Sequence, residues 1–447
     1  MIPKNTDLLQ VFHFDKLSLI LMGLVAFVAI SIGSFSIRYL KGDTKQKAFF
    51  LNLVVLVASI FVMVCADNIL LLMASWTISN IFLARLMLHK SAWKAARESS
   101  VLALKNFMLG FAFLGAALTI LYCLTGETSI QPILIKPIGF KWGMVCGLLI
   151  LLAAMSQSAI WPFHRWLTSS LNSPTPVSAI MHAGLINGGG FLLARFAPML
   201  TIQPLILNLI FIGGITTALL GTLWKLMQSD VKRMLACSTM GQMGFMIAQC
   251  GSGLFPAAVA HLCWHGLFKA YLFLSSGSAA KEKRLDLDYP PSLKDFLKAL
   301  FCGVLAAYLF SVTSGKHLLV ADTTLFLIFL SMIAGAQFAL TIIRGHGKAK
   351  LLKAMAATLF MGAFYGLNVK IIELILAPLH ISVPQPLNIL HFIAAILLLV
   401  AWMAMLFMRT SLKHPYPKWI LYGYVQMLNA SQPHPKTVTA NRNEYQF

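Results

Sequence analysis

The sequence predicts an all-α membrane protein, a polytopic bundle of about 12 or 13 transmembrane helices. Hydrophobic residues make up 58% of the 447 positions and charged residues only 11%, less than half of the roughly 25% that is typical of soluble domains. Apolar runs of about 20 residues, long enough to cross a bilayer, recur along nearly the whole chain. This composition excludes a water-soluble core.

Thirteen apolar segments are the candidate spans. They cover residues 17–36, 49–65, 68–88, 105–124, 143–161, 177–197, 204–227, 235–252, 257–279, 297–313, 322–343, 352–378 and 387–408. We therefore expect one transmembrane domain over residues 1–410, followed by a polar C-terminal tail over residues 411–447.

The net charge of +21 fits membrane topology better than nucleic-acid binding. Dense Lys and Arg can neutralise phosphates, but here the basic clusters lie in short loops between apolar runs. They are Arg38 with Lys41, residues 90–97, residues 281–284 and residues 344–353. Such loops face the cytoplasm under the positive-inside bias. We expect a multi-pass protein of the bacterial inner membrane, surrounded by lipid and not bound to nucleic acid.

Three prolines predict an interruption between the fifth and sixth spans. They are Pro162, Pro174 and Pro176. Because proline removes a backbone donor and clashes with the preceding turn, one helix should end near Ile160 and the next should start near Val177. Broken helices at membrane depth occur where protein or water surrounds them, and they mark ion sites in transporters. The glycines at 188–190 should allow another helix to approach closely.

A polar row marks the ninth span. His261, His265 and Lys269 are spaced at i, i+4 and i+8, so they lie on one helical face. A charged residue at mid-bilayer costs about 2.5–3.5 kcal/mol and needs a partner or a function. Histidine gains and loses protons near neutral pH, and a buried lysine can do so as well. The row predicts a proton relay; the alternative is that each histidine bonds a carbonyl and fixes packing.

Other polar residues are weaker candidates. His182 follows the proline interruption and is either a relay member or a structural histidine. Asp230 and Lys232 open the helix of the eighth span, where a carboxylate can cap the N-terminus. A cap is therefore the alternative to a supporting role for Asp230. Gln337 is a further polar residue, in the eleventh span.

We expect no metal site and no cofactor in this chain. A His-x-x-x-His pair can bind zinc, as in His-Glu-x-x-His. Leu262 stands at the glutamate position, however, and no third ligand is evident. The seven cysteines lie singly, without the paired spacing of a zinc site or a disulfide framework.

Three segments carry a resemblance to a known family: SPTPVSAIMHAGLINGGGFLLAR, SDVKRMLACSTMGQMGFM and AHLCWHGLFKAYLFLSSGS. They resemble the antiporter-like, proton-translocating family that includes the large membrane subunits of respiratory complex I and the Mrp sodium/proton antiporters. The resemblance continues upstream through FDKLSL, IRYLKGD and ADNILLLMASW. It implies that five residues fall on the family's central proton path: His182, Lys232, His261, His265 and Lys269.

Two departures from complex I subunits matter. Thr77 follows Trp76 where those relatives have a glutamate, and Gln157 stands where they have a lysine. The resemblance implies that the missing ion pair is the one thought to drive pumping there. Thr77 and Gln157 are therefore expected at most to support a relay, since Gln157 does not titrate and could only orient water or Lys232.

One branch of the family fits these departures better. The membrane subunits of DAB-type inorganic carbon pumps lack this glutamate and are similar in HAGLINGGGF and STMGQMGFM. This resemblance implies a proton-conducting transporter subunit, not an enzyme. Its partner would be a large, peripheral, DabA-like subunit that holds zinc and resembles a carbonic anhydrase, and proton flow would energise conversion of CO2 to bicarbonate.

Two alternatives stay open at this point. One is a subunit of a complex I-like or Mrp-like assembly, and the other is a structural member of the fold whose relay has decayed. The mechanism that we expect is proton entry by a half-channel near the interruption, transfer through His182 toward His261, His265 and Lys269, and release on the cytoplasmic side.

Overall fold

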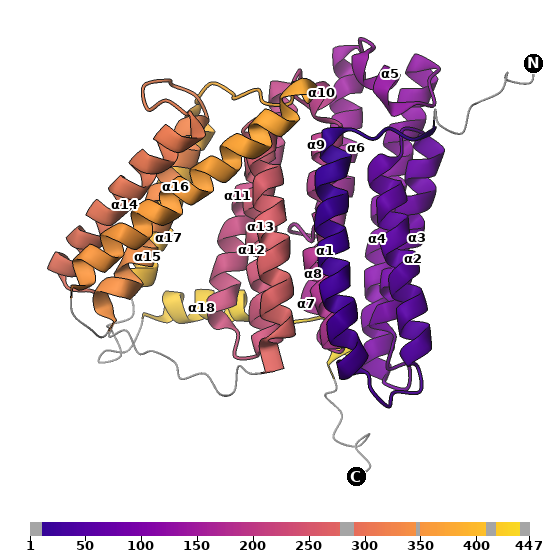
Figure 1. Cartoon of the computed structure of the whole chain (residues 1–447), viewed down its shortest axis with the longest axis horizontal. Coiled ribbons are helices and arrows are strands. Elements are labelled where there is room, and N and C mark those ends of the chain that lie inside the picture. The colour runs from indigo at the N-terminus through magenta and orange to yellow at the C-terminus, as the bar shows by residue number, and fades with distance from the viewer. Residues whose placement is uncertain (1–10, 278–289, 346–348, 408–416, 439–447) are drawn as a thin grey trace, which may run out of the picture. The chain divides into compact units, whose positions relative to one another are not determined.

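The computed structural model describes residues 11–277, 290–345, 349–407 and 417–438, and these form helices joined by short connections (Figure 1). Within these ranges there are isolated bridge pairs but no extended strand. Twelve of the helices described are long and apolar enough to cross a membrane. The prediction of an all-α bundle with 12 or 13 spans is confirmed.

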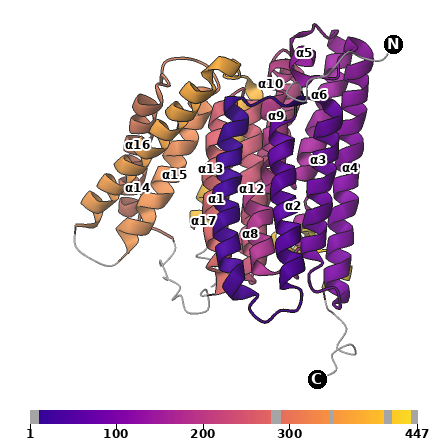
Figure 2. The ribbon, with the colours of Figure 1, turned by 45° about the vertical axis from the view of Figure 1, so that its right-hand side comes forward.

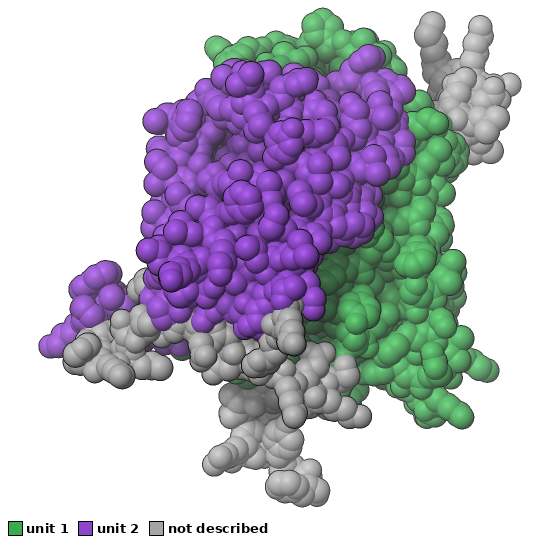
Figure 3. Space-filling view, turned by 60° about the vertical axis from the view of Figure 1, so that its left-hand side comes forward, with its two compact units in different colours: residues 1–251, 261–280, 427–447 green, residues 252–260, 281–426 purple. Residues whose placement is uncertain are grey.

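The chain divides into two compact units, coloured separately in Figure 3. Unit 1 comprises residues 1–251, 261–280 and 427–447, and unit 2 comprises residues 252–260 and 281–426. Helix α13 (Phe255–Leu274) contributes its first turns to unit 2 and the rest to unit 1. The basic cluster at 281–284 and residues 346–348 of the last cluster lie outside the described residues.

Unit 1 begins with four long helices that lie side by side (Figure 2). They are α1 (Lys16–Tyr39), α2 (Gln46–Cys65), α3 (Ile69–Met87) and α4 (Lys94–Thr125). A short α5 (Ile130–Ile135) leads to α6 (Phe140–Gln157). The interrupted segment consists of α7 (Arg165–Thr168), α8 (Thr175–Ala183), the 3-10 turn η2 (Leu185–Asn187), α9 (Gly188–Arg195) and α10 (Ala197–Leu200). The unit continues with α11 (Pro204–Met227), α12 (Val231–Gly251) and most of α13.

Helix α12 is less apolar than the other spans because protein, not lipid, covers most of it. Glycines bring it against α11: a Cβ on Gly221 would lie 2.4 Å from the backbone nitrogen of Gly241, and one on Gly244 would lie 2.5 Å from that of Ala218. A helix buried in this way can carry polar side chains inward without exposing them to hydrocarbon. The buried polar residues of α12, such as Thr239 and Gln249, can therefore lie at membrane depth.

Unit 2 contains α14 (Leu293–Ser314), α15 (Thr324–Arg344), α16 (Lys350–Leu376), η4 (Ala377–Leu379) and α17 (Ile389–Phe407). Small residues allow its helices to approach closely, since a Cβ on Gly362 would lie 2.4 Å from the carbonyl oxygen of Ala306. The indole N–H of Trp402 donates to Oε1 of Gln337 at 2.8 Å. Gln337 therefore joins α15 to α17 inside unit 2.

The basic loops of unit 1 lie together at one end. Nε2 of His89 and a carboxylate oxygen of Asp43 are 2.9 Å apart, and Nζ of Lys45 donates to the hydroxyl of Ser91 at 2.7 Å. The hydrogen bond from His89 lowers the pKa of Asp43 below its ordinary value. The α1–α2 and α3–α4 loops are joined there, at the end that the positive-inside bias assigns to the cytoplasm.

Helix α12 begins at this same basic end. The hydroxyl of Ser99, in the second turn of α4, donates to the carbonyl of Ser169 at 2.8 Å, and Nζ of Lys232 donates to the carbonyl of Ser173 at 3.1 Å. Since α12 starts at the basic end, α13 starts at the opposite end and returns. Lys269 therefore lies nearer the basic end than the histidines that precede it on α13.

The end of α18 (Lys418–Ala430) and the residues after it are tied to unit 1. The amide of Gln228 donates to the hydroxyl of Ser431 at 2.9 Å, and the amide of Asn172 donates to the carbonyl of Thr437 at 2.9 Å. These bonds attach the described part of the polar tail to the loops at the basic end.

A buried ion pair joins the end of the interrupted segment to the start of α1. Arg195, the last residue of α9, pairs with Asp15 at the start of α1, and the two side chains are only 4% and 5% exposed. A second guanidinium nitrogen donates to the hydroxyl of Ser18 and the carbonyl of Val64, each at 2.9 Å. Burial raises the pKa of Asp15, but Arg195 and Ser18 outweigh it and hold the pKa below its ordinary value.

We expect Arg195→Met to destabilise the chain by about 3–5 kcal/mol, because it leaves the Asp15 carboxylate buried without a counter-charge. The double variant Asp15→Leu, Arg195→Met should lose much less, since replacing both partners with apolar groups removes the desolvation cost. Thermal unfolding of the detergent-purified protein measures both. A double variant that loses as much stability as Arg195→Met, or more, would contradict this account.

Candidate functional site

The interruption between α8 and α9 is held by side chains from the end of α6. Nε2 of Gln157 reaches the carbonyl of Leu185 at 3.4 Å, and the hydroxyl of Ser158 donates to the carbonyl of Ile186 at 2.7 Å. Backbone groups released from a helix at membrane depth need such internal partners. The break at residues 184–187 is therefore stable inside the protein. The sequence analysis placed its break earlier, between Ile160 and Val177, and expected a continuous helix across this point.

The glycines after the interruption permit a close helix contact. A Cβ on Gly189 would lie 2.4 Å from the carbonyl oxygen of Ala154 on α6, and one on Gly190 would lie 2.4 Å from the sulfur of Met246. The expectation that the run at 188–190 lets another helix approach is confirmed. Upstream, α8 starts beside Pro174 and Pro176, while Pro162 follows the end of α6.

His182 is buried on α8 between two other helices. Its Nδ1 lies 3.0 Å from the hydroxyl oxygen of Thr239 on α12. Its ring stacks on Phe273 of α13, with centroids 4.3 Å apart and planes 19° apart. The structure thus brings His182 against α12 and α13, although more than fifty residues separate it from either contact.

Thr239 and Lys269 share one carbonyl acceptor. The Thr239 hydroxyl donates to the carbonyl of Leu235 at 3.0 Å, and Nζ of Lys269 donates to the same oxygen at 3.3 Å. Since a hydroxyl has one hydrogen to donate, Thr239 accepts from Nδ1–H of His182 in this arrangement. The neutral His182 ring then has Nε2 free of hydrogen and able to accept a proton.

Lys269 is 1% exposed, and it makes no ion pair with any residue that the structure describes. The row extends from it along α13. The rings of His261 and His265 are nearly parallel, with centroids 6.1 Å apart. Within the described ranges, neither ring nitrogen of His265 has a protein partner, and Nε2 of His261 has none.

Three of the remaining candidates lie apart from this cluster, and Lys232 is one helical turn before Leu235 on α12. Lys232 lies at the basic end, bonded to the carbonyl of Ser173 as described above. Asp230 is exposed and accepts from the backbone N–H of Arg233 at 2.9 Å, which is the geometry of a helix cap. Thr77 donates to the carbonyl of Met73 within its own helix at 2.8 Å. Gln337 lies in unit 2, bonded to Trp402.

Gln157 forms a reciprocal amide pair with Asn80 on α3. Nε2 of Gln157 donates to Oδ1 of Asn80 at 3.1 Å, and Nδ2 of Asn80 donates to Oε1 of Gln157 at 3.3 Å. Both side chains are buried. The position that the resemblance associates with a charged pair thus holds a neutral contact, and its partner is Asn80, not Thr77.

Sequence reasoning missed Asn80 and Thr239. Asn80 follows Trp76 by one helical turn in an otherwise apolar run, which is a signal that the pattern did contain. Thr239 lies inside a quoted motif, but a threonine bonded to its own helix is common and marks no site by itself. Only the contact with His182 distinguishes it.

The structure describes no group of three or more His, Cys, Asp or Glu side chains placed to hold a metal ion. The cluster of α8, α12 and α13 instead offers titratable nitrogens and hydroxyls. Imidazole and amine nitrogens of this kind are able to bind and release protons.

Comparisons with known proteins show which family the chain belongs to. Residues 66–315 match the family model described as NADH:quinone oxidoreductase/Mrp antiporter, TM, and residues 4–50 match that of the complex I chain 5 N-terminus. The first match spans more than half of the chain. The chain belongs to this family of antiporter-like membrane subunits.

Several relatives are inorganic carbon transporter subunits by name. The chain is 37% identical over 280 residues to a probable inorganic carbon transporter subunit DabB1 of Halothiobacillus neapolitanus, covering 61% of this chain and 50% of that one. It is 37% identical over 272 residues to a DabB of Bacillus subtilis, covering 60% and 54%. The chain thus spans about half the length of these relatives, which are transporter subunits.

A complex I subunit and a solved structure are also similar. NADH-quinone oxidoreductase subunit L of Escherichia coli is 35% identical over 273 residues, covering 59% of this chain and 44% of that one. The Mrp complex of Dietzia sp. shares the fold with a TM-score of 0.57 and 24% identity, covering 94% of this chain and 45% of that chain. The membrane-bundle fold is therefore common to these assemblies.

We expect Thr239→Val to cost about 1–3 kcal/mol, because it leaves Nδ1 of His182 buried without its partner. The same change should shift the His182 tautomer away from Nδ1–H, which nitrogen-15 NMR of labelled histidine detects. Thr239→Ser is the matched control and should retain both the stability and the tautomer. An unchanged tautomer in the valine variant would show that Thr239 does not orient the ring.

Proposed function

We propose that this chain is the proton-conducting membrane subunit of an energy-coupled inorganic carbon pump in the bacterial inner membrane. The observation that carries the proposal is Lys269, which is buried without an ion-pair partner among the described residues. It donates to the same Leu235 carbonyl as Thr239, the residue that contacts His182. A buried ammonium without a counter-charge costs several kcal/mol. A group that releases its proton avoids that cost, which suits a relay.

The order of the groups along the path follows from the contacts. His261 and His265 precede Lys269 on α13, and His182 lies at the Lys269 end of the row. Proton transfer from the non-basic side would therefore run from His261 through His265 to Lys269 and His182. The sequence-based mechanism put His182 first, but its contacts favour the last place.

Water completes the proposed path between the side chains. The rings of His261 and His265 are too far apart for a direct hydrogen bond, and both nitrogens of His265 lack protein partners among the described residues. Buried polar groups of this kind are normally satisfied by ordered water. In the proposal, water links each imidazole to the next and then to Lys269.

The neutral pair of Asn80 and Gln157 favours the carbon pump over a redox-coupled assembly. These amides hold the interruption together but cannot exchange charge as an ion pair does. The similarity to DabB proteins supports the same reading. The partner would be a large peripheral subunit that holds zinc, and downhill proton flow would drive its conversion of CO2 to bicarbonate.

The second candidate is a subunit of a complex I-like or Mrp-type assembly. The similarity to subunit L of Escherichia coli and the shared fold with an Mrp complex favour it. The two candidates differ in what the chain assembles with, because the chemistry of either complex resides in other subunits.

Replacing Lys269 should decide whether the row conducts protons. In proteoliposomes holding the full chain with its partners, Lys269→Met should reduce proton flux by about a hundredfold or more, as loss of a positioned proton-transfer group does. Lys269→Arg should also fail, because arginine keeps its charge and does not release a proton. Lys141→Met, at an exposed position, is the control. Full flux in Lys269→Arg would indicate that residue 269 serves as a fixed charge and that protons do not pass through it.

Co-purification should separate the two candidate assemblies. When the tagged chain is extracted in mild detergent, we expect one large soluble protein at a fixed ratio, with zinc in the same sample. Mass spectrometry and metal analysis provide the readout. Several further membrane subunits with flavin or iron-sulfur centres, and no zinc, would replace the carbon-pump proposal with the second candidate.

A further inference from the structure

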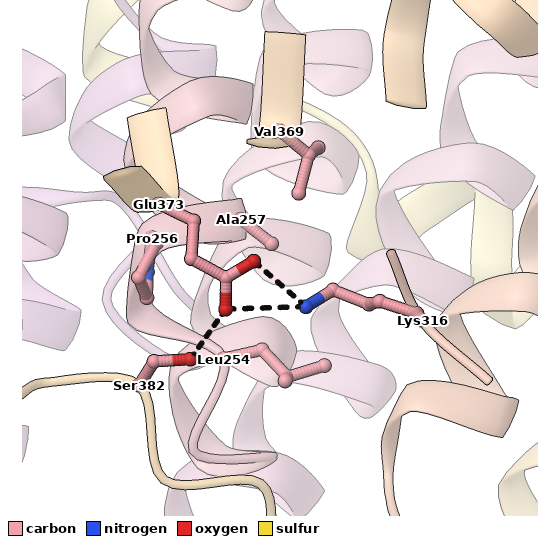
Figure 4. Close-up of a pocket in the computed structure, with 7 residues that line it drawn as sticks. All are labelled: Leu254, Pro256, Ala257, Lys316, Val369, Glu373 and Ser382. Carbon is pink, nitrogen blue, oxygen red and sulfur yellow. Dashed lines mark hydrogen bonds and ion pairs between the residues drawn. The ribbon is translucent and has the colours of Figure 1, made fainter. Parts of the chain in front are cut away.

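Unit 2 contains a partly buried ion pair at the ends of two spanning helices (Figure 4). Lys316 follows the last turn of α14, and Glu373 lies in the last turn of α16. Nζ of Lys316 lies 3.2 Å and 3.4 Å from the two carboxylate oxygens, and the side chains are 7% and 23% exposed. The hydroxyl of Ser382 donates to the same carboxylate at 2.8 Å.

Apolar side chains form the walls of this small pocket. They are Leu254, Pro256, Ala257 and Val369. None of these four wall residues is titratable. Among the lining residues, Lys316 is therefore the charged group that contacts the Glu373 carboxylate. Other titratable residues at this end of unit 2 lie outside the pocket lining: Lys370, His317, His380 and Asp322.

The pair lies at the non-basic end of unit 2. Lysines gather where α14 and α16 begin, at Lys294, Lys298, Lys350 and Lys353. Lys316 and Glu373 lie where the same two helices end. Under the positive-inside bias this is the extracytoplasmic end, so the carboxylate is placed near the outer aqueous phase.

The pocket also meets the start of α13. Ala257 lines it, and it precedes His261 by four residues on the same helix, which puts it on the same helical face. The family match ends at residue 315, so neither Lys316 nor Glu373 belongs to the segment on which the family is defined. Ionisable side chains in membrane segments are rare and are functional by default.

We infer that Glu373, held between Lys316 and Ser382, is a proton-exchanging carboxylate at the extracytoplasmic end of unit 2. The inference rests on the proposed proton-conducting function and adds its outer proton port. A proton from the outer water forms an O–H bond with the carboxylate, and the ion pair with Lys316 is lost. Release of that proton restores the carboxylate and the pair, while the ammonium keeps its own protons throughout.

An infrared titration of the full chain in proteoliposomes tests whether Glu373 exchanges protons. On acidification the wild-type protein should gain a protonated-carboxyl band that Glu373→Gln lacks. Lys316→Met removes the ion-pair partner of the carboxylate and should change the frequency of that band. Glu127→Gln removes an exposed carboxylate of unit 1 and should leave the band in place. A Glu373→Gln spectrum identical to wild type would overturn the inference.

A measurement of proton flux tests whether protons bound at Glu373 reach the proposed path on α13. Glu373→Gln keeps the size of the side chain and should lower the flux about tenfold or more, the scale of a lost proton-transfer group. Glu127→Gln should not change it. If Lys269→Met abolishes flux and Glu373→Gln leaves it unchanged, the port is refuted and the proposed function stands. If the wild type shows no flux, the proposed function fails, and the port with it, whatever the infrared titration shows.

Discussion

At membrane depth, each backbone group released from a helix needs a partner inside the protein, and the interruption between α8 and α9 depends on this constraint. Gln157 and Ser158 at the end of α6 bond the carbonyls of Leu185 and Ile186. Arg195 then closes the segment onto α1. Between these two attachments, α8 is fixed so that His182 faces Thr239 and Phe273. The position of His182 thus follows from hydrogen bonds in which His182 itself takes no part.

The same constraint shapes the electrostatics of unit 1. The amide pair of Asn80 and Gln157 satisfies four polar groups with no net charge, so it needs no counter-ion in a medium that penalises charge. Lys269, in contrast, is buried among the described residues without a carboxylate. On the proposed path along α13, a proton would meet one buried titratable cation, with no adjacent ion pair among the described residues to open or close. This electrostatic arrangement suits conduction coupled to chemistry in another subunit.

Residue spacing predicted the part of the site that lies on one helix. His261, His265 and Lys269 share a face because their separation matches the helical repeat, and the prolines marked the break between α6 and α8 because they cannot donate. Thr239, Lys316 and Glu373 gave no such signal. Each has its role through a partner from another helix or loop, as Glu373 has through Lys316 and Ser382. Contacts between distant segments leave no periodicity in a single sequence.

The sequence by itself determined the membrane class, the approximate ends of the spans, the interrupted helix and the row on α13. These follow from hydropathy and from local backbone chemistry, which act over a few turns of chain. Tertiary structure decided which polar groups meet, that His182 lies at the Lys269 end of the row, and that a carboxylate and an ammonium meet at the outer end of unit 2. Those outcomes depend on how helices pack, and packing is set by small residues and by hydrogen bonds between segments far apart in the chain.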